Sequence, residues 1–440
     1  MQSNPKRGKL WFSFCLIGGM LMKGKGWKIV LAITAILLLF GTLSVVVYWG
    51  VVGITDFDEG MQHIAKLILP KENNVYRKAT YSVSDEKAEK TSDRVVATVA
   101  DAELTNGLLQ IFYWMDVYEY LEDYGYYAVY YGLDHTQPLD QQTCKDTEGT
   151  WQHFFLDKAL LNWHSYQALA MMAEKEGHAL NEDYRTDLEN LRADLTDAVL
   201  DSDYASIEAM LQADLGVGCD YDDYYRYMET YYSGYSYLKE RLDQVEITED
   251  MLREYYDTHA EELEKDGITL ASGDLKDVRH ILIAVEGGTE NEEGEITYSD
   301  QEWETCRKEA QAILDQWLAG EATEESFTAL AYEYSEDSGS NGNGGLYKDL
   351  DAQSGFVQEF IDWYMDESRK PGDYGLIRTE YGYHVMYFVE SEAQWLRTCR
   401  QGVITDQTAE ILNEAREAYP MEVEYKKIAL GVVDLGQEAE

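Results

Sequence analysis

The 440-residue sequence lacks the motifs that mark several enzyme classes. It has no His-Glu-x-x-His zinc motif, no Gly-x-Ser-x-Gly nucleophile turn and no Cys-x-x-Cys pair. Its eight histidines are too dispersed to suggest a metal site. The glycine-rich segment 338–345 (SGSNGNGG) lacks the Gly-Lys-Ser/Thr of a phosphate-binding loop. We therefore expect no cofactor, no metal and no nucleotide.

Basic residues are scarce, because 36 Lys and Arg stand against 83 Asp and Glu. Six basic residues and no acidic residue precede Asp56, so the remainder holds 30 basic and 83 acidic residues, a formal charge of −53. A body this anionic repels nucleic acid, which excludes it as a partner. The simplest interpretation of the acidity is a well-solvated surface.

Cysteine is also rare. Four of the five cysteines, Cys144, Cys219, Cys306 and Cys399, are spaced too widely for a zinc ribbon. They are compatible with one or two disulfides in an oxidising exterior, or with free buried thiols. Cys15 is given no role.

An uncharged, mostly apolar run of 26 residues, 29–54, is long enough to span a bilayer. We predict a single transmembrane helix over 27–54. Basic residues lie just before it, which places residues 1–26 in the cytoplasm and the acidic remainder outside the cell membrane. A cleaved signal peptide is the alternative, although its apolar region is usually shorter. The apolar run 10–22 is too short to span, and the natural start could be Met20 or Met22.

The rest of the chain divides by pattern. Residues 55–93 are polar and predict a juxtamembrane linker, whereas apolar positions recur every three or four residues across most of 94–270, which predicts a helical lobe. We expect residues 393–440 to complete that lobe with a helix over about 405–418 and a strand over 423–433. That strand could pair with the strand-like run 94–99.

Two tyrosine clusters, 112–131 and 221–237, each hold eight tyrosines within the expected helical lobe. Tyrosine buries a large area and keeps a polar group, so it suits both helix packing and adaptable binding surfaces. Both interpretations remain open: rings that pack helices together, or a cradle for client proteins.

Residues 276–392 change to a mixed pattern that predicts a small α+β domain. Residues 278–284 alternate as a strand, and Ser299 with Glu302 forms a capping box before a helix with one apolar face. Further helices are expected over about 324–334 and 355–365, and a hairpin over 374–378 and 383–389. The fold class is therefore α+β, with an antiparallel sheet covered by helices and inserted into the helical lobe.

Five blocks within this segment resemble, in order and spacing, a parvulin-type peptidyl-prolyl isomerase. They are VRHILI from Val278, FxxLAxxYSEDSGS from Phe327, GGL from Gly344, GFVxxF from Gly355, and KPGD from Lys370 with YGYHV from Tyr381. A parvulin domain flanked by helical segments behind an anchor is similar to the PrsA/SurA class of extracytoplasmic foldases. Residues 95–106 resemble the start of their chaperone lobe, a less specific match.

The resemblance implies the roles of individual residues. His280 and His384 would be the paired histidines of the site, with Asp337 near the susceptible carbonyl and Thr379 in the histidine network. The alternative is that the histidine pair is a buried structural network.

Leu346, Phe356 and Phe360 would form the proline pocket, although Phe356 and Phe360 at i, i+4 on a helix are core residues in most proteins. The loop 286–297 has five glutamates and no basic residue, so a phosphorylated substrate would be repelled.

The resemblance therefore implies a non-covalent peptidyl-prolyl isomerase that acts on unmodified X-Pro bonds of unfolded exported proteins. The alternatives are a catalytically idle parvulin domain in a membrane-anchored holdase, and an envelope scaffold.

Overall fold

The computed structural model describes residues 81–433 except 125–127, 145–148 and 291–295. The predicted transmembrane helix over 27–54 lies outside the described residues. Among the residues described, no helix is both long and apolar enough to cross a membrane. The described chain divides into two compact units, a sheet unit of residues 256–399 and a helical unit of residues 81–255 and 400–433.

The sheet unit contains one four-stranded antiparallel sheet in the order β10-β11-β6-β9. Its strands are β6 (Asp274–Ala284), β9 (Leu346–Leu350), β10 (Tyr374–Arg378) and β11 (Gly382–Ala393). The predicted strand over 278–284 and the predicted hairpin are confirmed. The strand β9 and the extension of β11 to Ala393 were not predicted from the sequence.

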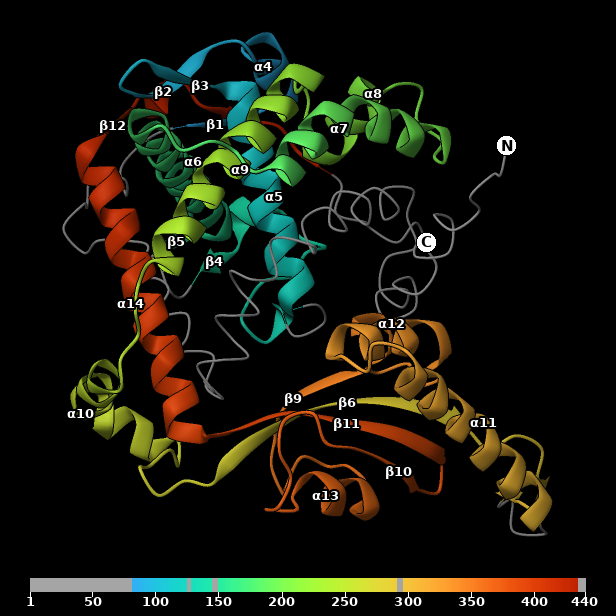
Figure 1. The fold of residues 1–440 in the computed structure, drawn as a ribbon. Coiled ribbons are helices and arrows are strands. Elements are labelled where there is room, and N and C mark those ends of the chain that lie inside the picture. Colours follow the sequence, from blue (N-terminus) through green and yellow to red (C-terminus); the bar gives the residue numbers. More distant parts are fainter. Residues whose placement is uncertain (1–80, 125–127, 145–148, 291–295, 434–440) are drawn as a thin grey trace. The chain divides into compact units, whose positions relative to one another are not determined.

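Helices cover both faces of this sheet (Figure 1). They are α11 (Asp300–Ala319), α12 (Glu324–Tyr334) and α13 (Gln358–Tyr364). The capping box of Ser299 and Glu302 is present, as predicted. Ile281 and Val385 face α11 and α12, whereas Val278 and Met386 face α13. Because side chains alternate along a strand, His280 and His384 lie on the α13 face with Val278 and Met386.

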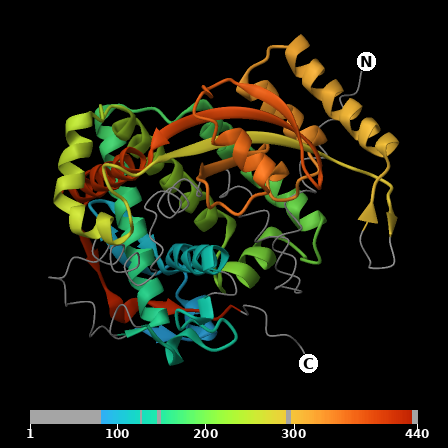
Figure 2. The same cartoon turned by 90° about the horizontal axis from the view of Figure 1, so that it is seen from below.

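A two-stranded hairpin of β7 (Thr289–Glu290) and β8 (Ile296–Thr297) leads into α11, as the small yellow arrows of Figure 2 show. It interrupts the acidic loop that the sequence analysis placed at 286–297.

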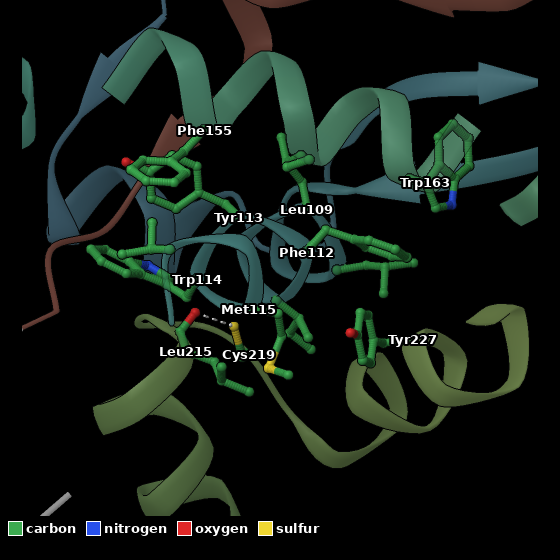
Figure 3. Close-up of a cluster of buried hydrophobic side chains, with 14 of the residues drawn as sticks. Leu109, Phe112, Tyr113, Trp114, Met115, Phe155, Trp163, Leu215, Cys219 and Tyr227 are labelled. Carbon is green, nitrogen blue, oxygen red and sulfur yellow. Dashed lines mark hydrogen bonds between the residues drawn. The ribbon is translucent and has the colours of Figure 1, made fainter. Parts of the chain in front are cut away.

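The helical unit has its core around α5 (Asn106–Tyr124), as Figure 3 shows. The side chains of Phe112, Tyr113 and Trp114 pack there against residues of the neighbouring helices. Those helices are α6 (Trp151–Glu176), α7 (Glu182–Leu200), α8 (Ile207–Leu215) and α9 (Tyr221–Asp243). The prediction of a mostly helical segment is confirmed. The segment also contains the short hairpin β4 (Thr143–Cys144) and β5 (Gly149–Thr150).

Both ends of the described chain meet in the helical unit. The strand β12 (Met421–Val423) pairs with β2 (Val95–Val99), which also pairs with β3 (Ala102–Thr105). The strand β1 (Ser82–Val83) pairs in parallel with β13 (Ala429–Leu430), and the short helix α4 (Asp85–Lys90) follows β1. The predicted pairing of the two ends is confirmed.

The predicted long strand over 423–433 is wrong, because a 3-10 turn (Tyr425–Lys427) separates two short strands.

The boundaries between the two units fall within α10 (Glu249–Lys265), which is kinked at His259, and within α14 (Gln394–Ala418). The predicted start of the last helix near residue 405 is wrong, because α14 follows β11 directly. Trp395, Cys399 and Val403 are buried along its first turns.

The structure decides between the alternatives that the sequence left open for the cysteines and for the second tyrosine cluster. Cys144, Cys219, Cys306 and Cys399 are all buried, and the free-thiol alternative describes Cys219, Cys306 and Cys399. Five of the eight tyrosines of the second cluster are buried and the other three are half-buried, so that cluster packs helices together. The buried ones are Tyr224, Tyr227, Tyr231, Tyr232 and Tyr237.

Candidate active site

Two histidines from neighbouring strands meet on the α13 face of the sheet. The antiparallel register pairs His280 with Met386 and His384 with Leu282, so the two histidines are diagonal neighbours on one face. Their Nδ1 atoms lie 3.0 Å apart and their rings are near parallel, with centroids 5.2 Å apart. His280 is 3% exposed and His384 5% exposed, so the pair is shielded from water.

The loop after α12 brings Asp337 to this pair by running along the edge of β6. Leu282 donates its backbone N–H to the Ser335 hydroxyl and accepts a hydrogen bond from the Glu336 N–H. The loop returns at Gly345, whose carbonyl accepts from the His280 N–H at 2.8 Å. Gly345 has φ +76°, and a Cβ there would lie 2.1 Å from the His280 carbonyl oxygen. Only glycine allows this close approach.

Asp337 is held by several donors. Its Oδ2 lies 2.8 Å from His280 Nε2 and accepts from the hydroxyls of Ser340 at 2.5 Å and Tyr347 at 2.9 Å. Its Oδ1 accepts from the Gly339 N–H at 3.2 Å. Burial by itself raises the pKa of Asp337, but the hydrogen bonds from His280, Ser340 and Tyr347 outweigh burial and hold the pKa well below its usual range. Asp337 is therefore an ionised acceptor at neutral pH.

Thr379 closes the other end of the network. Its hydroxyl lies 2.8 Å from His384 Nε2 and accepts from the Tyr381 N–H at 3.2 Å. The residue is 3% exposed. Burial, reinforced by the neighbouring His280, lowers the pKa of His384 to about 3, so this imidazole is neutral at neutral pH.

These contacts fix the direction of the hydrogen bonds. An ionised carboxylate only accepts, so His280 carries a proton on Nε2. When both rings are neutral, His384 Nδ1 donates to His280 Nδ1, and the Thr379 hydroxyl donates to His384 Nε2. A second proton on His280 would reverse both bonds, because His280 Nδ1 would then donate. The network can therefore exist in two directions that differ by one proton.

Aromatic side chains surround the pair. Phe360 is 1% exposed and meets both histidine rings edge-on, with centroids 5.1 Å from His280 and 5.5 Å from His384. Phe356 is half-buried and stacks on Phe360 at 5.0 Å. The Tyr347 ring lies 4.8 Å from Phe356 and 5.5 Å from His280. Within the described part of the chain, Leu346 is not among the side chains of this cluster.

The structure thus joins His280, His384, Asp337 and Thr379 in one hydrogen-bonded network and places Phe356 and Phe360 beside it. Sequence reasoning missed two members, Ser340 and Tyr347. The three-residue spacing between Asp337 and Ser340, typical of a turn closed by side-chain hydrogen bonds, was the available signal for Ser340. In the described residues, no group of His, Cys, Asp and Glu side chains could hold a metal ion.

Comparison with known proteins gives one family match. Residues 267–392 match the family model described as the PPIC-type PPIase domain. No curated protein matches the chain.

Among solved structures, PrsA from Bacillus subtilis is 16% identical, with 64% of this chain and 93% of that chain covered and a TM-score of 0.30. A structure of the SurA-like chaperones PEB4 and Cj1289 of Campylobacter jejuni is 19% identical, with 74% and 96% covered and a TM-score of 0.20. These scores are too low to carry an argument about the fold. The family match covers residues of the sheet unit only. The sheet of this unit carries the histidine pair. Residues 267–392 are thus similar to the PPIC-type, or parvulin-type, peptidyl-prolyl isomerase domain, a match that covers less than half of the chain.

Proposed function

We propose that residues 267–392 catalyse rotation about X-Pro bonds without covalent chemistry, and that the chain is a foldase for exported proteins at the outer face of a membrane. The observation that carries the catalytic part is the buried, directional network of Asp337, His280, His384 and Thr379 beside an aromatic cluster.

Prolyl isomerisation breaks no covalent bond, so the site needs to supply only modest transition-state stabilisation. Amide resonance sets a barrier of about 18–20 kcal/mol, and uncatalysed X-Pro isomerisation takes tens to hundreds of seconds. An acceleration of about 10³- to 10⁵-fold needs about 4–7 kcal/mol of preferential stabilisation of the twisted amide. Apolar side chains that bind the prolyl ring, and a few oriented hydrogen-bonding groups, are sufficient for this.

The geometry supports a non-covalent route. Asp337 Oδ2 accepts from Ser340 and Tyr347 and faces His280 Nε2, so its electron pairs are engaged. A carboxylate held in this way is a poor nucleophile towards an amide. Asp337 instead orients His280 and fixes a proton on its Nε2.

The direct test measures isomerisation of a proline tetrapeptide by the full chain. We expect a rate above the uncatalysed one, and a loss of about tenfold or more in kcat/KM for His384→Ala, because removal of a transition-state interaction worth 1.4 kcal/mol costs tenfold. The matched control is His135→Ala, which replaces a histidine of the helical unit. If the wild-type chain shows no rate above background, only the alternative of a catalytically idle binding protein is left.

The proposed location rests on the apolar run 29–54 and the basic residues before it. It predicts that protease added outside cells stripped of their wall or outer envelope cleaves the linker 55–93 and releases the acidic part of the chain. Protection of that part until the membrane is lysed would contradict the proposed orientation.

The proposed partners are unfolded or partly folded exported proteins with X-Pro bonds. The acidic, phosphate-repelling region 286–297 supports unmodified rather than phosphorylated substrates. The matched assay compares Ala-Pro, Ser-Pro and phosphoserine-Pro peptides, and the phosphorylated peptide should be the poorest substrate.

A further inference from the structure

The four-stranded sheet has two edge strands, β9 and β10 (Figure 1). The edge at β9 is closed by a side chain and by irregular pairing. The Asn343 side chain donates to the Leu346 carbonyl at 2.9 Å and accepts from the Leu346 N–H at 3.0 Å. The register with β6 shifts between residues 276 and 278, and Asp349 has φ +57°. A further strand therefore finds no regular row of free main-chain groups at β9.

The bonding pattern of β10 follows from the two ends of its hairpin with β11. At one end the Thr379 N–H donates to the Gly382 carbonyl at 2.9 Å, and at the other the Phe388 N–H donates to the Asp373 carbonyl at 2.7 Å. The register between these ends has no shift. Because bonded and non-bonded pairs alternate in an antiparallel ladder, the odd residues from 373 to 379 are those that bond to β11.

The even residues of β10, Tyr374, Leu376 and Arg378, consequently point their N–H and C=O groups away from the sheet. No hydrogen bond to these groups comes from the part of the chain that the structure describes. The strand (YGLIR) contains no proline or lysine, residues that often protect an edge. Arg378 does not protect it either, because its guanidinium lies 3.6 Å over the centre of the Trp303 ring. The edge at β10 is therefore open to pairing.

This open edge is close to the histidine pair. Ile377 pairs with His384 across β10 and β11, and its side chain packs in the hydrophobic cluster on the α13 face. Thr379, the residue after β10, lies within hydrogen-bond distance of His384. Because neighbouring strands lie about 4.8 Å apart, a strand added to β10 would run roughly 10 Å from β11. A segment bound there keeps the rest of its own chain near the network.

Charge determines which partner fits this edge. Residues 256–399 hold 33 Asp and Glu against 10 Lys and Arg, a formal charge of −23. The exposed Glu380 follows one end of β10, and the half-buried Asp373 precedes the other. Two copies of this unit would repel each other, whereas a segment with basic residues would be attracted. Main-chain bonds need no particular side chains, which suits an extended partner of variable sequence.

We propose that β10 binds an extended, basic segment of an unfolded client protein as an added strand of the sheet, through main-chain hydrogen bonds to Tyr374, Leu376 and Arg378. This rests on the proposed function for the source of the segment, an unfolded exported protein. The edge holds the client by its backbone, while the histidine network acts on an X-Pro bond elsewhere in the same client.

The test uses the full chain and a heptapeptide without proline, Lys-Thr-Val-Ser-Val-Thr-Lys. Amide hydrogen exchange is measured by NMR with and without saturating peptide. We expect the amides of Tyr374, Leu376 and Arg378 to exchange at least about tenfold more slowly with the peptide bound. The amides of Gly375 and Ile377 bond to β11 in both states and serve as the internal control. Unchanged exchange at the three outward amides would overturn the proposal.

Two N-methylated versions of the peptide show whether its main chain is recognised. One carries methyl groups on alternate amides from the second residue, and the other on alternate amides from the third. An added strand turns only one of these two sets of amides towards β10. One version should therefore bind at least about tenfold more weakly than the other. Equal affinities would mean that side chains are recognised, which contradicts the proposal.

Leu376→Pro removes one outward donor without removing a ladder bond to β11. It should weaken peptide binding about threefold to tenfold, the loss of one main-chain hydrogen bond. The matched control Leu376→Ala also loses the leucine side chain but keeps the N–H, and should bind the peptide as wild type does. Equal affinities of the two variants would count against the proposal. Exchange at Ile377 reports whether the ladder is intact in each variant, and the methylated peptides decide the matter on wild type if it is not.

The chemistry of the partner is tested with charge. Replacing both lysines of the peptide by glutamate should weaken binding at least about tenfold at low salt, and high salt should reduce the difference. Equal binding of the two peptides would contradict a basic partner. If the three outward amides exchange slowly without peptide, and more slowly as the protein concentration rises, a second copy occupies the edge and the proposal is wrong.

This inference and the proposed function fail separately, because the peptide contains no proline. Peptide binding at β10 by a chain without isomerase turnover would remove the catalytic claim and retain the added strand. Isomerase turnover without protection of the β10 amides would do the reverse.

Discussion

The Nδ1 atoms of His280 and His384 face each other at 3.0 Å, so one of them must carry a proton and the other must not. This single contact links every hydrogen bond of the site, from Thr379 at one end to Asp337 at the other. A change at either end therefore alters the protonation of the whole pair.

Asp337→Ala should lower kcat/KM by about 10- to 100-fold, because it removes a charge-assisted hydrogen bond worth about 1.5–3 kcal/mol. The loss should appear in kcat more than in KM, since Asp337 orients His280 and the prolyl ring binds elsewhere. The measurement is a full kinetic profile of the purified chain. An equal loss for the exposed-loop variant Ser338→Ala would argue against a specific role of Asp337.

Thr379→Val replaces the hydroxyl by a methyl group of similar size. The substitution removes the hydrogen-bond partner of His384 Nε2 and of the Tyr381 N–H. Because Thr379 is only 3% exposed, water does not replace the hydroxyl. We therefore expect a loss of about 1–3 kcal/mol in unfolding free energy. Thr379→Ser keeps the hydroxyl and should recover most of the loss. Urea unfolding of both variants checks this, and equal stabilities would show that the hydroxyl contributes nothing.

The lowered pKa of His384 has a consequence for stability against pH. The unfolded chain binds a proton near pH 6.5 and the folded chain only near about 3, so stability falls as the pH drops below 6.5. One such group contributes a slope of at most about 1.4 kcal/mol per pH unit. His384→Gln should remove this contribution between pH 6 and pH 4.

Three buried carboxyls of the helical unit change the stability with pH in the direction opposite to His384. Burial raises the pKa of Asp116 to about 7 and those of Asp214 and Asp223 to about 6, so the folded chain binds more protons there than the unfolded chain. The prediction therefore compares wild type with His384→Gln. The quantity compared is the slope of the free energy of unfolding against pH, measured by chemical unfolding at each pH. Parallel curves would refute it.

Arg397, in the first turn of α14, holds the strands of the sheet unit together. Its Nη1 lies 2.6 Å from Asp277 and 2.7 Å from Asp349, and its Nη2 lies 3.0 Å from Glu390. Asp277 is buried, and Asp349 has φ +57°, a conformation that needs local support.

Arg397→Ala should destabilise the sheet unit by about 3–5 kcal/mol, because it leaves the buried carboxylate of Asp277 without its counter-charge. The double variant with Asp277→Ala should recover part of that loss. A thermodynamic cycle of the two single variants and the double variant measures the coupling. Additive effects would mean that the pair does not interact.

Sequence alone determined the elements that local patterns encode. The capping box of Ser299, the helix over 324–334 and the strand over 374–378 need only neighbouring residues, and each forms as predicted. The resemblance also named His280, His384, Asp337 and Thr379 before their contacts were known. The apolar spacing of Trp395, Cys399 and Val403 could have revealed the true start of α14.

Only the tertiary structure decided which neighbours share a face and which atoms meet. The short strand β9 has no clear apolar alternation, so the sequence could not tell Leu346 from Tyr347 as the side chain beside His280. Its register is set by pairing with β6, about seventy residues earlier, and a shift of one residue would exchange the two side chains. The direction of the hydrogen-bond network likewise depends on burial and on distances between strands, which no local pattern encodes.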